Sequence, residues 1–243
     1  MPSPETLFFA LSGGILPALL WLWFWLQEDR LHPEPRGMII RTFIAGMIVV
    51  PLVLPIEQFI ENHYGFDLTL VIFLWACAEE LFKFVAAYFA ALDTDEYNEP
   101  IDAVIYMITA ALGFAAMENV FFLISSIGNS NLTVALITGN LRFIGATLLH
   151  ILSSGAIGLF VGLAFCKSQF VKKISLALGV ILAILLHTLF NVYIIKEVGV
   201  KIFEVFGRTW EINKIFIIFC FVWVATILLI AGFEKVKQIK KCR

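Results

Sequence analysis

The sequence predicts an all-α integral membrane protein, a polytopic helical bundle with about seven transmembrane helices. The chain has 243 residues, of which 60% are hydrophobic and only 15% are charged, whereas a soluble domain is closer to half apolar and a quarter charged. The apolar residues also come in blocks of about 20, the length that a helix needs to span a bilayer. The net charge of −2 gives no reason to expect nucleic-acid binding. The lipid bilayer is therefore the expected environment.

Short polar segments separate seven apolar blocks. The first block follows "MPSPET", which lacks the positive region of a signal peptide, so we expect a retained helix. The sixth and seventh blocks are separated by "KEVGVKIFEVFGRTWEINK", which is long enough for a short interfacial helix. The four cysteines form no CxxC pair, and we expect them to behave as inert, apolar-like side chains. The predicted spans are 6–27, 38–57, 68–92, 100–125, 139–166, 174–196 and 212–233.

The orientation follows from the Lys and Arg residues of the loops, which concentrate on the cytoplasmic side of a membrane. One side holds Arg30, Arg36, Arg41, Lys167, Lys172, Lys173, Lys235, Lys237, Lys240, Lys241 and Arg243. The other side holds Lys196, Lys201, Arg208 and Lys214, with Arg142 at its edge. We therefore predict a cytoplasmic C-terminus and an N-terminus outside.

Ionisable residues inside four of the spans are the least expected feature of the chain. A charge near the bilayer centre costs roughly 2.5–3.5 kcal/mol on insertion scales, so such residues are usually paired or functional. A helical rise of ~1.5 Å per residue places Glu79, Glu118, His150 and His187 at a similar level, ~11–17 Å from the outer side. The ionisable residues in question are Glu79, Glu80, Lys83, Glu118, Arg142, His150 and His187, and the neutral amides Asn119 and Asn191 accompany them.

Each of these residues also has a structural interpretation. Glu79 and Lys83 are spaced i, i+4 and can neutralise each other, and Arg142 can extend its charge to the membrane surface. Glu118 can be protonated and hydrogen-bonded. His150, and His187 with Asn191, can join helices by hydrogen bonds. These interpretations weaken when taken together, because the groups share one depth. Two carboxylates, a third from another helix and two histidines are what water activation requires.

Four motifs carry a resemblance to a known family. "EELFK" (79–83), "GFAAMEN" (113–119), the lone His150 and "HTLFN" (187–191) resemble the motif set of the PrsW family of intramembrane proteases, relatives of the type II CAAX prenyl proteases. "HPEPRG" (32–37) and "NEPIDAVIY" (98–106) are similar to two further stretches of that family. The resemblance implies one membrane-embedded protease domain over 1–243, with a motif-bearing core at about 28–196. The final helix (212–233) and the basic tail (234–243) carry no motif of the family.

The resemblance also implies roles for the residues. Glu79 or Glu80 is similar to the family's water-activating glutamate and Lys83 to its motif lysine. Glu118 stands where the prenyl proteases have a histidine. His150, His187 and Asn191 match the third and fourth motifs, and Asn119 and Arg142 are supporting residues. Ala103 and Met107 depart from glycines that are frequent in the family, which we interpret as changed packing.

The cofactor stays open at this point. A zinc ion could be held by Glu118, His150 and His187, because the family is commonly described as a metalloprotease group. A metal-free mechanism, with glutamate as the base, is the alternative, since its relatives have been argued to work without metal.

The resulting prediction is an endopeptidase of a prokaryotic cytoplasmic membrane that cleaves a membrane-anchored protein, such as an anti-sigma factor. The sequence leaves two alternatives. A proton-coupled transporter or channel uses the same buried carboxylates and histidines, although the chain shows no internal repeat of the kind that many transporters have. A non-catalytic scaffold would be expected to have lost at least one motif residue.

Overall fold

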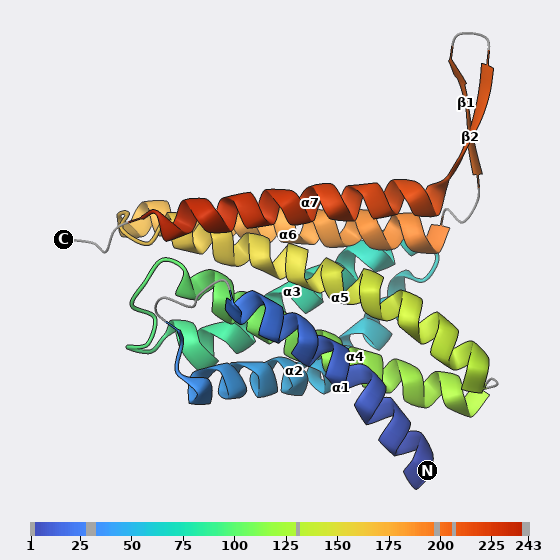
Figure 1. Ribbon diagram of the computed structural model, residues 1–243, viewed down its shortest axis with the longest axis horizontal. Helices are drawn as coiled ribbons and strands as arrows, with labels where there is room; N and C mark the ends of the chain where they lie inside the picture. The colour runs from blue at the N-terminus through green and yellow to red at the C-terminus, as the bar shows by residue number, and fades with distance from the viewer. Residues whose placement is uncertain (1–2, 28–32, 130–131, 197–199, 206–207, 240–243) are drawn as a thin grey trace.

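The computed structural model describes residues 3–27, 33–129, 132–196, 200–205 and 208–239, and the side chains of 3–27, 33–126, 145–193 and 220–239. Within these residues the chain forms seven α-helices, most of them lying along the long axis of the molecule (Figure 1), which confirms the predicted all-α bundle. The elements are α1 (Pro4–Leu26), α2 (Arg36–Tyr64), α3 (Leu68–Ala87), the π-helix η2 (Tyr88–Leu92), α4 (Asp102–Asn129), α5 (Leu132–Leu163), α6 (Gln169–Lys196), β1 (Val200–Val205), β2 (Arg208–Asn213) and α7 (Lys214–Lys237).

Five of these helices, α1, α2, α4, α5 and α6, are long and apolar enough to cross a membrane by length and composition. The helix α3 is outside this set and carries the charged side chains of Glu79, Glu80 and Lys83 in its sequence. It begins where Asp67 caps it, with the Asp67 carboxylate accepting from the backbone N–H groups of Thr69 (2.9 Å) and Leu70 (3.2 Å). The predicted third span at 68–92 therefore corresponds to α3 followed by η2.

The helix α2 is longer than predicted. We expected its span to end near residue 57, but the helix contains Pro51 and Pro55 and continues to Tyr64. Proline in a helix interior removes one backbone hydrogen bond, and neighbouring helices can compensate for it in a membrane bundle. As a consequence Glu57 belongs to a helix rather than to a loop.

The segment between α6 and α7 differs from the prediction. We expected a short interfacial helix, whereas the described residues form an antiparallel hairpin in which Val200 pairs with Asn213 and Val205 with Arg208. The hairpin projects away from one end of the bundle (Figure 1). The sequence of β1, VKIFEV, contains three β-branched residues, and such residues are enriched in strands.

The core of the bundle is built around α4 and α5. In their most apolar windows 72% of the residues are buried, against 22% in α1 and α6, so α4 and α5 are central and the other two present most of their surface outward. Glycines let α2 approach α4 closely. A Cβ added to Gly46 would lie 2.1 Å from the Ala110 carbonyl oxygen, and one on Gly113 would lie 2.0 Å from that of Phe43. Small residues at helix contacts are typical of membrane proteins.

The two additional stretches of the sequence resemblance meet at one end of the bundle. Tyr106 on α4 donates a hydrogen bond to Glu34, which precedes α2. Asp102 Oδ2 accepts from the backbone N–H groups of Asn98 (2.9 Å) and Glu99 (2.7 Å) at the start of α4. These contacts tie the segment before α2 to α4.

The positions that depart from the family pattern are closely packed. Ala103 and Met107 are both fully buried. Ala103 lies against a glycine of α5, because a Cβ on Gly158 would come within 2.6 Å of the Ala103 carbonyl oxygen.

The cysteines differ in part from the expectation. Cys77 and Cys220 are free thiols. Cys166, in the turn between α5 and α6, is disulfide-bonded and so is not the inert, apolar-like side chain that we expected.

Candidate active site

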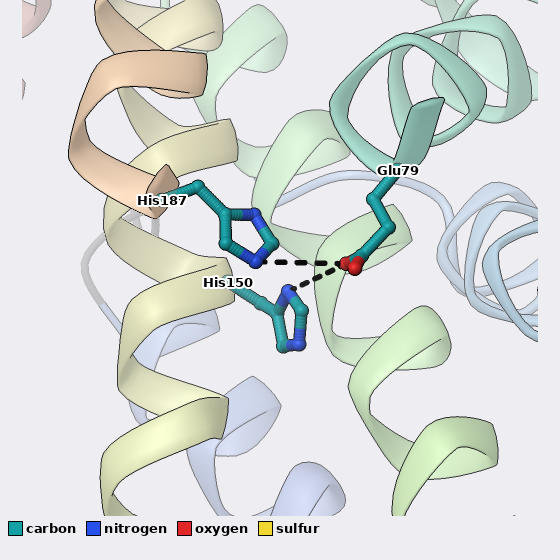
Figure 2. Close-up of side chains that lie close together, drawn as sticks. All are labelled: Glu79, His150 and His187. Carbon is teal, nitrogen blue, oxygen red and sulfur yellow. Dashed lines mark ion pairs between the residues drawn. The ribbon is translucent and has the colours of Figure 1, made fainter. Parts of the chain in front are cut away.

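Three side chains from three helices converge inside the bundle. Glu79 on α3, His150 on α5 and His187 on α6 are 7%, 2% and 1% exposed. Figure 2 shows the three pointing toward one another. Glu79 Oε2 lies 3.7 Å from His187 Nε2 and 3.9 Å from His150 Nδ1. These distances are too long for direct hydrogen bonds.

The helix α3 brings its polar residues to this point because they share its inward face. The buried positions Ala76, Glu79, Glu80, Lys83 and Ala87 are separated by the three- and four-residue steps that follow one side of a helix. The small side chains of the two alanines allow α3 to lie near its neighbours. The charged residues are thereby carried into the protein interior rather than toward lipid.

His187 is oriented by Glu80. His187 Nδ1 donates to Glu80 Oε1 at 2.8 Å, since a carboxylate oxygen can only accept. A neutral imidazole with its proton on Nδ1 has its lone pair on Nε2, and that nitrogen faces Glu79. The hydrogen bond to Glu80 at Nδ1 therefore determines whether His187 Nε2 offers a lone pair or a proton to the centre of the site.

His150 is arranged in the same way through Glu118. Its Nε2 lies 2.8 Å from Glu118 Oε2 and donates to it, so that Nδ1 carries the lone pair. The ammonium of Lys83 donates to this Nδ1 at 3.0 Å. Lys83 is fully buried and its Nζ lies 4.9 Å from the centre of the Phe114 ring.

The two adjacent glutamates have different surroundings. Glu80 is fully buried, and its Oε1 accepts from Lys83 (2.5 Å), His187 (2.8 Å) and Ser153 (2.8 Å), while Oε2 accepts from Ser154 (2.8 Å). Glu79 Oε2 is buried and has no hydrogen-bond partner among the described residues. Glu80 is therefore engaged on both oxygens, whereas Glu79 presents a free oxygen to the centre.

The centre is chemically suited to a cation or to a water molecule. Glu79 Oε2, His150 Nδ1 and His187 Nε2 are all acceptors, and the three residues offer ligand atoms that lie within 4.8 Å of one another. Three nitrogen and oxygen donors of this kind are typical of catalytic zinc sites, and the carboxylates behind both histidines are typical of the shell around such sites. The donor set therefore fits zinc. In this conformation Lys83 occupies the lone pair of His150 Nδ1, so an ion would replace that hydrogen bond.

Glu118 occupies a different place from the one expected for a ligand. For the case that a metal is used, we expected Glu118, His150 and His187 to be its ligands. In the structure Glu118 contacts the outer nitrogen of His150, Nε2, and its side chain is 27% exposed. Among the described residues, the three side chains close enough together to hold one metal ion are Glu79, His150 and His187.

The remaining expected residues surround the site. Asn119 is buried and donates from Nδ2 to Thr147 Oγ1 at 3.4 Å, which links α4 to α5. Asn191 is half-buried on α6, one turn beyond His187. Arg142 lies on α5, in a stretch whose side chains are outside the described residues.

Three polar residues near the site were not expected from the sequence. Ser153 and Ser154 on α5 bind Glu80, and Glu57 on α2 interacts electrostatically with Glu79. A signal for each exists. The serines lie three and four residues after His150, and Glu57 lies four residues after the buried Val53, so both follow a buried face of their helix.

The chain is similar to known proteins over most of its length. The sequence profile of a family described as "PrsW family intramembrane metalloprotease" matches residues 34–232. A "Protease PrsW" of Oceanobacillus iheyensis is 30% identical over 188 residues, covering 76% of this chain and 82% of that protein. A "Protease PrsW" of Halalkalibacterium halodurans is 28% identical, with 76% and 83% covered, and one of Clostridioides difficile is 26% identical, with 76% and 78% covered. No solved structure matches the chain.

Proposed function

Because the chain belongs to the PrsW family of intramembrane metalloproteases, we propose that it cleaves a membrane-anchored protein and that Glu79 activates the attacking water. The observation that carries this proposal is the unpartnered Oε2 of Glu79, which is buried and directed at the inward nitrogens of His150 and His187. A base must have a free oxygen within reach of the water whose proton it accepts. Glu80 lacks this freedom, since both of its oxygens accept hydrogen bonds from protein groups.

The proposed reaction uses the side chains in the following order. Glu79 accepts a proton from water, whose oxygen attacks the carbonyl carbon of the scissile peptide bond. The negative charge that develops on the carbonyl oxygen needs a nearby positive group or donor. Lys83 Nζ, 3.9 Å from Glu79 Oε2, is the nearest protein cation to this space among the described residues. Glu79 then delivers its proton to the departing amine nitrogen, and the carbon–nitrogen bond breaks.

In a zinc-dependent form of the reaction, the ion would be held by Glu79, His150 and His187. Glu79 Oε2 would then be a ligand rather than the base, so the two roles of Glu79 belong to alternative mechanisms. When bound, it supplies a Lewis acid that polarises the carbonyl group and lowers the pKa of the water. Glu80 and Glu118 would keep each imidazole in the tautomer whose lone pair faces inward. Lys83 would release His150 Nδ1 and keep its contact with Glu80.

The buried position of the site supports a substrate that is itself embedded in the membrane. Glu118 is the most exposed of the three carboxylates Glu79, Glu80 and Glu118. Its side chain is 27% exposed, against 10% for Glu79. We therefore propose that the substrate approaches along the Glu118 side, between α4 and α5. A single-span regulator, such as a membrane-anchored anti-sigma factor, is a substrate of this kind.

The test is reconstitution of the purified protein in liposomes with a panel of single-span membrane proteins. Cleavage should be lost when a chelator strips the metal and should return on addition of zinc. Cleavage that continues after complete metal removal would exclude the zinc mechanism and leave the glutamate mechanism. No cleavage of any panel member by metal-loaded protein would contradict the proposed class of substrate.

A further inference from the structure

We propose that Ser153 and Ser154 are positioning residues that fix Glu80, and through it the tautomer of His187. This inference deepens the proposed function and rests on it for the role of His187. Neither serine belongs to the motifs that the sequence resembles, and both are fully buried in the middle of α5. They reach Glu80 on α3 from adjacent positions of one helix.

The two hydroxyl groups bind both oxygens of the Glu80 carboxylate. Ser153 Oγ lies 2.8 Å from Oε1, and Ser154 Oγ lies 2.8 Å from Oε2. Two donors on the two oxygens fix the rotation of the carboxylate plane, which one donor leaves free. Ser154 is the only described donor to Oε2, whereas Oε1 also accepts from Lys83 and His187.

The consequence reaches the centre of the site through His187. Glu80 Oε1 can accept from His187 Nδ1 only while the carboxylate keeps its present rotation. A neutral imidazole exposes a lone pair on Nε2 only when its proton is on Nδ1. If Glu80 turns away, the proton can move to Nε2, and the nitrogen that faces Glu79 becomes a donor. Partners behind a metal-binding histidine typically change metal affinity by 10–100-fold.

The alternative to a positioning role is a merely structural role for the serines. Ser153 Oγ also lies near the carbonyl oxygens of its own helix, 2.9 Å from Leu149 O and 3.3 Å from His150 O. Such bonds within a helix would explain a buried serine without any function. No bond of this kind is found for Ser154 among the described contacts, so Ser154→Ala is the sharper variant.

The first measurement is the tautomer of His187 in the metal-free protein. The chain has four histidines, so a sample labelled with ¹⁵N-histidine gives few signals, and a His187→Gln sample identifies the one of interest. We expect a single tautomer, protonated on Nδ1, in the unchanged protein and a mixture in Ser154→Ala. Ser154→Thr keeps the hydroxyl group and should restore the single tautomer. This measurement needs neither metal nor substrate.

The second measurement is zinc binding and cleavage in the same variants. We expect Ser154→Ala to bind zinc 10–100-fold more weakly and to lose kcat with little change in KM. The matched control is Thr109→Val, because Thr109 is fully buried on α4 and, among the described residues, its hydroxyl bonds only to Ile105 O of its own helix (2.7 Å). Ser153→Ala gives the same comparison from the other oxygen, should Ser154→Ala not fold.

The outcomes separate this inference from the proposed function. A His187 tautomer and a zinc affinity in Ser154→Ala equal to those of Thr109→Val would overturn the positioning role, even if the protein is an active protease. An unchanged protein that neither binds zinc nor cleaves a membrane protein would contradict the proposed function, while the tautomer measurement would still decide the role of the serines.

Discussion

Glu79 and Glu80 are neighbours in the chain, yet their surroundings assign them opposite tasks. Glu80 is held by Lys83, His187 and the two serines, so its charge is compensated inside the protein. A buried charge without such partners would be too costly to maintain. The free oxygen of Glu79 faces the histidines instead. One turn of helix thus contains a reactive carboxylate and an orienting carboxylate.

The first prediction compares Glu79, which faces the inward nitrogens of both histidines, with Glu118, which accepts from the outer nitrogen of His150. Glu79→Gln should lower kcat by about 10²–10⁴-fold, the range typical for loss of a general base, because an amide cannot accept the proton of water. Glu118→Gln should cost less, since its amide oxygen can still accept from His150 Nε2. Both rates are measured on one membrane-anchored substrate in liposomes.

One control and one contrary outcome make this comparison decisive. The exposed Glu234 near the end of α7 provides a glutamate-to-glutamine change outside the site. If Glu118→Gln proved as damaging as Glu79→Gln and lost its zinc as well, the ligand set expected from the sequence, with Glu118, would be favoured over the one with Glu79.

At the residue scale the sequence predicted which side chains meet but not how. The rise of a helix places Glu79, Glu118, His150 and His187 at one depth, and the structure brings them together. The choice of Glu79 over Glu118 at the centre depends on rotamers and on the rotation of each helix, which a count along the chain cannot supply. Ser153 and Ser154 escaped notice because serine is common at membrane helix contacts.

At the element scale, the position of the site depends on how closely α2 packs against α4. Gly46 and Gly113 place the two helices so near that a Cβ at either position would meet a backbone carbonyl oxygen at about 2 Å. Backbone atoms cannot move aside as the end of a flexible side chain can. The helix that carries Glu118 is thereby held against the helix that carries Glu57.

The second prediction follows from this contact. Gly113→Ala should destabilise the protein by about 1–3 kcal/mol, as overpacking of a close contact typically does, and it should lower the midpoint of thermal unfolding in detergent. Gly37→Ala is the matched control on α2, where an added Cβ would meet nothing within 4 Å and alanine favours the helix. Equal unfolding midpoints for the two variants would show that the crossing of α2 and α4 is looser than described.

The elements themselves were largely predictable, and the exceptions have physical reasons. Long apolar runs identify spans well because the bilayer sets their length. The length of the segment between α6 and α7 is compatible with an interfacial helix, and it is the β-branched residues of β1 that favour a strand. The polar residues from Glu57 onward predict a loop after this span, although the helix α2 continues to Tyr64.

At the scale of the whole molecule, two features point to opposite orientations in the membrane. The turn between α5 and α6 and the end of α7 carry Lys172, Lys173, Lys235 and Lys237, which the charge rule places in the cytoplasm. Cys166 lies in the same turn and is disulfide-bonded, and disulfides persist mainly in oxidising compartments. We favour the charge rule, because it rests on many residues distributed over several loops.

The third prediction is therefore a topology with the C-terminus in the cytoplasm and the hairpin outside. The two chain ends lie at opposite ends of the bundle, with the hairpin at the end opposite the C-terminus (Figure 1), so one measurement at each end determines the orientation. Green fluorescent protein fused after Arg243 should fluoresce, because it folds in the cytoplasm but not after export. Alkaline phosphatase inserted between Val205 and Arg208 should be active, because it needs an oxidising compartment. The reversed pair of results would overturn the charge rule for this chain. Because Glu79 lies about 11 residues or ~17 Å from the hairpin side of α3, close to the middle of a hydrocarbon core of ~30 Å, the reversed orientation would leave its depth almost unchanged.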